Sequence, residues 1–438
     1  MKVAVISRAV YPLHGVGGLE RHVRTAVKYL VREGAEVTLY VPPWDSAATA
    51  DAIEGVGIET APYRYLPLPR RAGFVIADRV TNYLLWSLRI AARIASCPVD
   101  IVQAEGAAGF GYALTRMPDR TPFVLQAHGM EEFKAKGLKA KAYLPLRAAT
   151  RFAAHRAAAV IAPDRVMLDE VMRYLRPRPE RLTALPMAID LEEIDRPVSE
   201  ETCTETFARC GIEPRMTVIL SVGRLESNKG FGVLVHALAK NRAFLPEPTV
   251  WVVVGGGSEE TALRRRVSEL RLQDITRFVG RVSDEALSVL YERASLFVHP
   301  TLFEGSSLVT LEAMAHSKAV VATRIGGIPD KVEDGRTGFL VPANDPDSLG
   351  REVLRILSSE SFLAEAGRRA RKRVESEFSW NRRARELMGL YRRVVEEHRC
   401  VQKRVSPPFE GIASAVSPTP RLPPVSEKSP KPAARGRS

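Results

Sequence analysis

MKVAVISRAVYPLHGVGGLERHVRTAVKYLVREGAEVTLYV, residues 1–41, places one amphipathic stretch between two short apolar runs. Val3–Ile6 and Val37–Val41 have the length and composition of buried strands. Between them, Gly17–Arg32 repeats apolar residues at intervals of three and four, which predicts a helix with one buried face. This order is a βαβ unit, and it implies a parallel sheet that helices cover on both faces.

The same alternation continues along the chain and restarts near residue 215. With 438 residues the chain exceeds what one hydrophobic core usually organises, so two domains are expected. We predict an α/β fold of two Rossmann-like, doubly wound domains that face a cleft, with binding loops at the carboxyl ends of the strands. The further predicted strands are Ile101–Gln103, Phe123–Ala127 and Ala159–Ala162 in the first domain, and Val218–Val222, Val250–Val254, Arg277–Val279, Leu296–His299, Ala319–Ala322 and Gly338–Val341 in the second.

Changes in composition set the expected domain limits. Residues 1–190 form the first domain, a polar linker covers 191–214, and residues 215–377 form the second domain. Residues 378–400 predict a helix that packs back on the first domain. Residues 401–438 are rich in Pro, Ser and basic residues and have few large apolar ones, which predicts a disordered tail.

Composition and charge restrict the class of protein. Hydrophobic residues make up 45% of the chain and charged residues 26%, as in ordinary globular proteins. No run of about 18 apolar residues predicts a membrane-spanning helix, and the first apolar run is too short for a secretory signal, so we expect a cytoplasmic protein. The net charge of +13 is partly explained by the tail, where seven Lys and Arg face two Glu, so we expect no nucleic-acid partner.

A glycine-rich turn follows the first predicted strand. Gly15-Val16-Gly17-Gly18-Leu19-Glu20 lies between strand and helix, where Gly17 and Gly18 would let the backbone approach a ligand. The free N–H groups of the helix that follows would face a phosphate or another anion. A tight turn without a ligand explains the same residues equally well.

Two cations follow the first strand of the second domain. Ser221-Val222-Gly223-Arg224-Leu225-Glu226-Ser227-Asn228-Lys229-Gly230 places Arg224 and Lys229 near the carboxyl end of that strand. A departing diphosphate needs neutralisation of this kind. The alternative is that both side chains are solvated.

Two carboxylates frame the most informative motif. Glu304-Gly305-Ser306-Ser307-Leu308-Val309-Thr310-Leu311-Glu312 follows a predicted strand and Pro300. A helix that begins near Ser306 or Ser307 would point free N–H groups at a phosphate. Glu304 would then lie on the loop beside a reacting sugar, and Glu312 would accept hydrogen bonds from ribose hydroxyls. The alternative is a capped helix with a surface glutamate.

Taken together, these motifs resemble the family 4 glycosyltransferases of GT-B fold. The resemblance covers about residues 1–395 and depends on the order and spacing of several motifs rather than on any single one. They are Gly17-Gly18-Leu19-Glu20, His128-Gly129, Val222-Gly223-Arg224 with Lys229-Gly230, Glu304-x7-Glu312, Gly326-Gly327-Ile328-Pro329-Asp330 and Asp334-Gly335-x-x-Gly338-Phe339-Leu340-Val341.

The resemblance implies a retaining transferase. It would move a sugar from a UDP- or GDP-sugar to a hydroxyl of a carbohydrate or glycolipid acceptor, in the synthesis of cell-envelope polysaccharide or glycolipid, with the acceptor on the first domain. It implies neither a metal nor another cofactor, and Glu304 would not be a nucleophile. By resemblance, Arg224 and Lys229 hold the diphosphate, and the helix start binds phosphate through Ser307, Leu308 and Val309. The resemblance also implies that Glu304 contacts the sugar and that His128 reaches a sugar hydroxyl. Glu312 would bind the ribose, and Val282 would lie near the base.

Departures from the family pattern leave the donor open. Many members have Glu-Gly-Phe-Gly where this chain has Glu304-Gly305-Ser306-Ser307, and Asp330 stands where Glu is usual. Two other functions also fit: a non-catalytic partner that binds nucleotide sugar, and a two-Rossmann epimerase or phosphorylase. Asp345-Pro346-Asp347 has the spacing of metal-binding carboxylates, but a helix cap in a Pro-containing turn explains it better.

Residues 131–160 form a basic segment of the first domain. Lysines and arginines alternate there with Leu, Phe and Tyr, as in helices that lie on anionic membranes. A solvated basic face beside a core-facing stripe would have the same composition. We therefore expect either a peripheral membrane contact on the cytoplasmic side or an ordinary helix surface.

Overall fold

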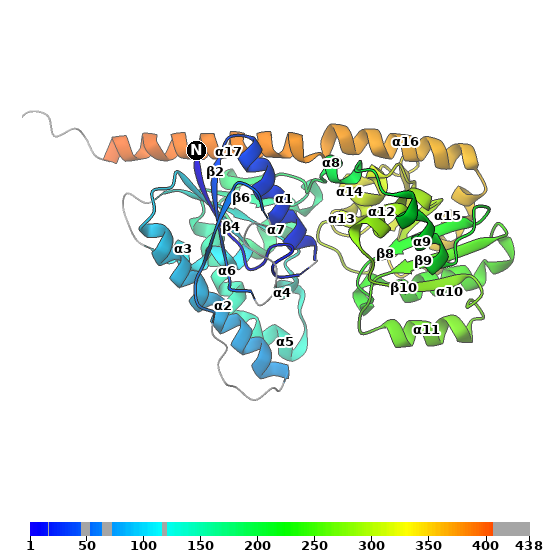
Figure 1. Ribbon diagram of the computed structural model, residues 1–438. Coiled ribbons are helices and arrows are strands. Elements are labelled where there is room, and N and C mark those ends of the chain that lie inside the picture. The colour runs from blue at the N-terminus through cyan, green and yellow to red at the C-terminus, as the bar shows by residue number, and fades with distance from the viewer. Residues whose placement is uncertain (16, 45–52, 64–71, 116–120, 406–438) are drawn as a thin grey trace, which may run out of the picture.

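The computed structural model describes residues 1–15, 17–44, 53–63, 72–115 and 121–405. They form two α/β domains, each built on one parallel sheet, which confirms the predicted fold class. Figure 1 shows the two domains side by side, with the long helix α17 along the first and α16 along the second.

The first domain contains a seven-stranded sheet in the order β3-β2-β1-β4-β5-β6-β7, and every neighbouring pair is parallel. The two edge strands, β3 and β7, were not predicted, because one is only half-buried and the other has three residues. The strands are β1 (Lys2–Ile6), β2 (Glu36–Val41), β3 (Val56–Thr60), β4 (Ile101–Glu105), β5 (Phe123–Gln126), β6 (Ala159–Ala162) and β7 (Leu182–Ala184).

Both faces of this sheet are buried, which is why its central strands are continuous apolar runs. Ala4 and Ile6 belong to the core under α2, α3, α6 and α7, while Val3 and Val5 belong to the core under α1 and α17. The helices of this domain are α1 (Gly18–Arg32), α2 (Ala72–Ala95), α3 (Phe110–Leu114), α4 (Glu131–Lys134), α5 (Gly137–Ala142), α6 (Leu144–Arg156) and α7 (Leu168–Leu175).

The second domain contains a six-stranded parallel sheet in the order β10-β9-β8-β11-β12-β13. Its strands are β8 (Thr217–Val222), β9 (Thr249–Val254), β10 (Thr276–Gly280), β11 (Leu296–His299), β12 (Val320–Thr323) and β13 (Gly338–Val341). Its helices are α10 (Phe231–Lys240), α11 (Glu260–Glu269), α12 (Asp284–Arg293), α13 (Leu308–Ala315), α14 (Ile328–Lys331), α15 (Pro346–Leu357) and α16 (Glu360–Glu377).

The stretch predicted as a linker, 191–214, contains two helices, α8 (Leu191–Ile194) and α9 (Glu200–Cys210). Ser199 caps α9, because its side chain accepts the N–H of Thr202. Helix α9 packs against α12 and β10 and is therefore part of the second domain. The helix was not predicted because its sequence is mostly polar.

Helix α17 (Trp380–Val405) returns the chain to the first domain. Leu387, Tyr391 and Val394 of this helix are buried in the core with β1 and α1. The helix continues to Val405, so residues 401–405, predicted as tail, are helical. The rest of the predicted disordered tail, 406–438, lies outside the described residues.

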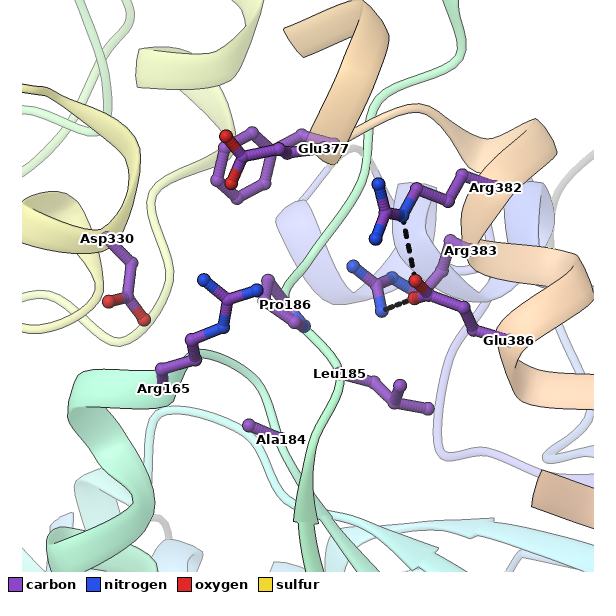
Figure 2. A pocket seen from close by; sticks show the side chains of 10 residues that line it. Arg165, Ala184, Leu185, Pro186, Asp330, Glu377, Arg382, Arg383 and Glu386 are labelled. Atoms are coloured by element: carbon purple, nitrogen blue, oxygen red, sulfur yellow. Dashed lines mark hydrogen bonds and ion pairs between the residues drawn. The ribbon is translucent and has the colours of Figure 1, made fainter. Parts of the chain in front are cut away.

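The chain crosses between the domains at two points that touch each other. The N–H of Ile189 donates to the carbonyl of Phe378 (2.8 Å), and the N–H of Trp380 donates to the carbonyl of Ile189 (3.1 Å). A cavity of about 110 Å³ lies beside this crossing. Figure 2 shows Arg165, Arg382 and Arg383 among the side chains that line it. Within the part of the chain that the structure describes, no helix is long and apolar enough to cross a membrane.

Candidate functional site

The carboxyl ends of β8 and β11, neighbours at the centre of the second sheet, carry two loops that are bonded to each other. The carbonyl of Asn228 accepts the N–H groups of Leu302 (2.8 Å) and Phe303 (3.1 Å). Gly230 has a φ of 67°, and a Cβ there would lie 2.0 Å from the carbonyl oxygen of Pro300. The sheet changes winding direction at this point, where α/β proteins bind ligands.

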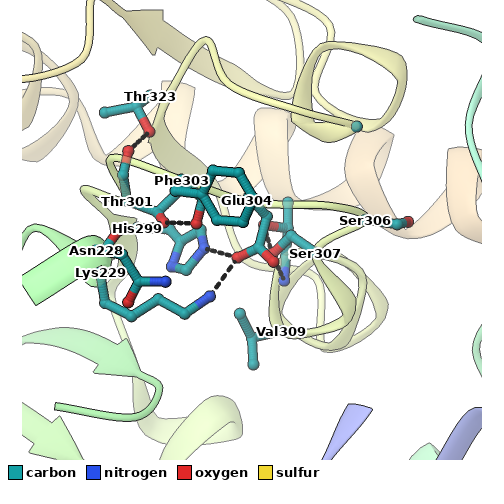
Figure 3. Close-up of polar contacts among 12 residues, drawn as sticks. Asn228, Lys229, His299, Thr301, Phe303, Glu304, Ser306, Ser307, Val309 and Thr323 are labelled. Carbon is teal, nitrogen blue, oxygen red and sulfur yellow. Dashed lines mark hydrogen bonds and ion pairs between the residues drawn. The ribbon is translucent and has the colours of Figure 1, made fainter. Parts of the chain in front are cut away.

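Lys229 and Glu304 come together at this junction of the loops. Lys229 Nζ lies 2.7 Å from a carboxylate oxygen of Glu304, and Nε2 of His299 lies 3.1 Å from the same oxygen. Figure 3 shows both side chains reaching Glu304. A carboxylate only accepts hydrogen bonds, so Nε2 of His299 carries the proton.

Electrostatics in this cluster favour an ionised Glu304. Burial alone would raise the pKa of its carboxyl, but the hydrogen bond from His299 and the charge of Lys229 lower the pKa to about 2. Burial lowers the pKa of His299, so its imidazole is neutral at pH 7. Glu304 is therefore a fixed negative charge.

Helix α13 begins directly after this loop. Its cap is Ser307, whose side-chain oxygen accepts the N–H of Thr310. Leu308 and Val309 form the first turn, where backbone N–H groups have no intrahelical partner and can bind an anion. The helix thus begins directly after the predicted start near Ser306 or Ser307, with Ser307 as its cap.

Glu312 lies in the second turn of α13 and accepts a hydrogen bond from the hydroxyl of Tyr291 (2.9 Å). Burial raises the pKa of the Glu312 carboxyl, and the nearby Arg21 of the first domain opposes this. Arg21 forms an ion pair with Asp284, at the start of α12. Val282, the residue expected near the base, is partly buried two positions earlier.

The first domain contributes His128, at the carboxyl end of β5. Its Nε2 lies 2.6 Å from Glu105 at the end of β4, so the imidazole is held by a buried carboxylate. Burial would raise the pKa of Glu105, but His128 lowers it below the usual value. The orientation of the His128 ring is thus set by a residue of its own domain.

Backbones of the two domains touch beside this histidine. A Cβ on Gly305 would lie 2.8 Å from Cα of Gly129, so only glycine allows this approach. A Cβ on Gly18 would lie 3.6 Å from Leu308, which shows that the glycine turn of the first domain faces the start of α13. Gly17 caps α1 through its backbone conformation.

The predicted site residues thus fall into three groups. Lys229 and Glu304 are in direct contact, while Ser307, Leu308, Val309 and Glu312 follow them along α13. His128, Gly17 and Gly18 belong to the other domain. There Gly18 faces Leu308, and Gly129, the residue after His128, meets Gly305. The side chain of Arg224 is exposed and makes no hydrogen bond or ion pair with any described residue, whereas its backbone carbonyl accepts the N–H of Glu226 (2.9 Å).

Three residues at the site were not predicted: His299, Glu105 and Tyr291. His299 and Glu105 are polar residues that end buried apolar strands, and this position alone could have indicated them. Tyr291 belongs to an ordinary helix, and nothing in the sequence distinguishes it.

The Asp345-Pro346-Asp347 motif is a helix cap. The carboxylate of Asp345 accepts the N–H groups of Asp347 (3.1 Å) and Ser348 (3.0 Å) at the start of α15. Among the described residues, no group of three or more His, Cys, Asp or Glu side chains could hold a metal ion.

The basic segment 131–160 divides into two parts. Lys134 forms an ion pair with Glu170, and Arg147 and Arg151 donate to backbone carbonyls, so these three cations are structural. Helix α5 and the start of α6 differ, because their apolar and basic side chains are exposed. We call this set the α5 patch: Lys136, Leu138 (79% exposed), Lys139, Lys141 and Leu144 (56% exposed).

Comparison with known proteins agrees with this geometry. Residues 16–193 match the model of Glycosyltransferase Family 4, and residues 204–373 match that of Glycosyl transferases group 1. The chain is 30% identical to alpha-maltose-1-phosphate synthase of Mycolicibacterium smegmatis, over 62% of this chain and 73% of that protein.

Solved structures share the fold. Sucrose-phosphate synthase of Thermosynechococcus elongatus superposes with a TM-score of 0.74 at 22% identity, over 90% of this chain and 99% of that one. HepE of Anabaena, in complex with UDP, superposes with a TM-score of 0.70 at 18% identity, over 89% and 99%. The chain therefore belongs to family 4 of the glycosyltransferases and has the GT-B fold.

Proposed function

We propose that this glycosyltransferase moves a sugar from a nucleoside diphosphate sugar to an acceptor hydroxyl with retention of anomeric configuration. The observation that carries the proposal is the cluster of Lys229, Glu304 and His299 at the central switch of the second sheet, opposite His128. In this proposal Lys229 and the start of α13 stabilise the departing diphosphate. Glu312 binds the ribose, and Arg224, still free on the surface, contributes a second cation.

The state of Glu304 supports a role in positioning rather than as a base. A general base works best with a pKa near the working pH, whereas the pKa of Glu304 is about 2. Its carboxylate oxygen is also occupied by Lys229 and His299. We propose that Glu304 orients sugar hydroxyls and that the leaving phosphate assists the incoming hydroxyl on the same face.

The donor is best sought among nucleoside diphosphate sugars. HepE, which shares the fold, was solved with UDP, and this supports UDP as the first nucleotide to test. We propose UDP- or GDP-sugars as donors and no metal cofactor, since cationic side chains and helix N–H groups are available for the diphosphate. Ser306 departs from the motif that the resemblance implies, and this leaves the identity of the sugar open.

A donor panel tests this proposal. UDP-, GDP- and ADP-sugars are compared by nucleotide release and by thermal shift in the wild type, Glu304→Ala and Lys229→Ala. Lys240→Ala is the matched control, because Lys240 also forms an ion pair (2.7 Å, with Asp347) but on the exposed surface of α10. We expect release in the wild type and control only.

The other outcomes identify the alternatives. Binding without release, unchanged by Glu304→Ala, would favour the non-catalytic partner. Turnover of the nucleotide sugar without transfer would favour an epimerase, and phosphate-dependent release would favour a phosphorylase. If no donor binds, the central proposal fails.

We further propose that the acceptor is a carbohydrate or glycolipid of the cell envelope and that the α5 patch contacts an anionic membrane surface. Two exposed leucines among three lysines combine apolar insertion with attraction to lipid headgroups. The test is co-sedimentation with vesicles that contain phosphatidylglycerol, reversed by about 0.5 M salt. Leu138→Asp should reduce binding, whereas Phe244→Asp should not, because Phe244 is similarly exposed (74%) but lies on the second domain. Binding that neither variant nor salt changes would refute this contact.

A further inference from the structure

A continuous chain of buried hydrogen bonds leads from the C-terminal helix to His128. The hydroxyl of Tyr391 on α17 donates to the side-chain oxygen of Gln103 on β4. Gln103 donates through Nε2 to Glu105 (2.6 Å), and the other oxygen of Glu105 lies 2.6 Å from His128 Nε2. Tyr391, Gln103 and Glu105 are 0%, 1% and 3% exposed.

The chemistry of the four groups fixes the direction of each bond. Glu105 is a carboxylate and can only accept, so it faces the amide N–H of Gln103 and the Nε2–H of His128. The amide oxygen of Gln103 is then left for the only remaining donor, the hydroxyl of Tyr391. Reversing any one bond would leave a buried donor or acceptor without a partner, which is costly.

The direction of these hydrogen bonds determines which ring nitrogen of His128 is available to a ligand. Because Nε2 faces Glu105, Nδ1 is the ring nitrogen of His128 that this carboxylate leaves free. The side chain of His128 is 24% exposed, and no described residue donates to Nδ1. His22, whose ring centre lies 5.7 Å away, is buried, and burial lowers its pKa to about 4, so it adds no charge at neutral pH.

We propose that Tyr391, Gln103 and Glu105 are positioning residues that hold His128 with Nδ1 directed at a hydroxyl of the transferring sugar. This rests on the proposed function, in which His128 contacts the donor sugar. The proposal extends the site to α17. The attachment of this helix to the first domain would then affect the rate of sugar transfer as well as the stability of the protein. At metal sites, removal of a carboxylate that orients a histidine typically changes activity about 10–100-fold, and we expect an effect toward the lower end of that range here.

The test combines an NMR readout with kinetics on the full chain. In the wild type, the Nε2 proton of His128 should give a downfield, slowly exchanging resonance, because it is buried against a carboxylate. Glu105→Gln, an isosteric change, should shift this resonance upfield and lower kcat about tenfold. The affinity for UDP should change less than twofold, because the proposed nucleotide contacts lie in the second domain.

Tyr391→Phe tests the far end of the chain. It should shift the same resonance and lower kcat by a smaller factor. The matched control is Tyr29→Phe, since Tyr29 is also buried (2% exposed) and donates to a carboxylate, Asp190 (2.8 Å), that has no link to His128. The control should leave the resonance and kcat unchanged.

Each outcome has one interpretation. An unchanged resonance and kcat in folded Glu105→Gln would overturn the proposal, as would equal effects of Tyr391→Phe and the control. The resonance is measured without a substrate. If it responds as expected while the wild type transfers no sugar, the network stands and the proposed function fails.

Discussion

The ion pair between Lys331 and Asp164 joins the two domains, and its loss should be costly. Lys331 Nζ, at the end of α14, lies 2.7 Å from the carboxylate of Asp164, which follows β6. Both side chains are 0% exposed. Lys331 also donates to Ser306 (2.9 Å) and to the carbonyl of Gly327 (3.1 Å). A Cβ on Gly327 would lie 1.8 Å from the Asp164 carboxylate, so the two surfaces fit closely.

We expect Lys331→Met to destabilise the protein by about 3–5 kcal/mol at pH 7, because it leaves the Asp164 carboxylate buried without its cation. Burial already raises the pKa of Asp164, and Lys331 opposes that rise. In the variant the pKa must rise further. The folded variant then binds this proton more tightly than the unfolded chain does, so the penalty should shrink as the pH falls.

Removing both charges should restore most of the loss. Lys331→Met with Asp164→Asn leaves no buried charge, and paired removals of this kind are often nearly neutral. The measurement is urea unfolding, followed by tryptophan fluorescence and by circular dichroism, with m-values compared to detect separate unfolding of the domains. A single-variant cost under about 1 kcal/mol, or a double variant as costly as the sum of the singles, would refute the reasoning.

Three further predictions concern the site. The pKa of Glu304 falls from 4.5 to about 2 on folding, so its stabilisation is complete above pH 4.5 and lost as the pH falls toward 2. This shift amounts to about 3 kcal/mol of unfolding free energy. Glu304→Gln should therefore make the unfolding free energy from urea titrations less dependent on pH between 2 and 4.5, and the same pH dependence in variant and wild type would contradict the prediction. Gly305→Ala should force the new Cβ against Gly129 and push the two domains apart, so kcat should fall at least about tenfold. Small-angle scattering should then show a larger radius of gyration, and an unchanged radius would exclude this separation of the domains. Glu312→Gln should weaken UDP binding about tenfold in calorimetry because a charge-assisted hydrogen bond is lost, and an unchanged Kd would remove Glu312 from the ribose site.

The central strands were predictable because each is buried on both faces and is therefore an apolar run. Leu296–His299 and Gly338–Val341 have the predicted limits. Val56–Thr60 was missed because an edge strand is covered less completely and its sequence is mixed. Helix α9 was missed because its packed face is small compared with its charged surface. Local patterns of apolar residues thus indicate burial, and they do not reveal elements that bury little surface.

Site residues were predictable where the chain itself signals a loop at the end of a strand. Glu304 and Lys229 lie in the segments that follow β11 and β8, and their motifs contain glycines that the structure requires. The partners of these residues were not predictable, because they depend on which strands become neighbours. Glu105 reaches His128 only because β4 and β5 are adjacent. Lys331 and Asp164 are 167 positions apart and meet only where the two domains touch.

The two halves of the site are each fixed within their own domain, and this has a consequence for motion between the domains. Glu304 is held by Lys229 and His299, all from the second domain, whereas His128 is held by Glu105 of the first. The chain crossings lie together at Ile189 and Ser379, so a rotation about that point leaves both clusters intact.

Such a rotation would change the distance between the halves and would break the contacts that join the domains, among them the ion pairs of Arg21 with Asp284 and of Lys331 with Asp164. Its closing limit is set by backbone contact between Gly129 and Gly305 and by the buried pair of Lys331 and Asp164. The same lysine bonds Ser306, the residue after Gly305, so the contact that stops closure also fixes the loop that carries Glu304. Domain closure and the placement of Glu304 are therefore coupled, and a change at the junction should alter kcat even where the proposed diphosphate contacts are unchanged.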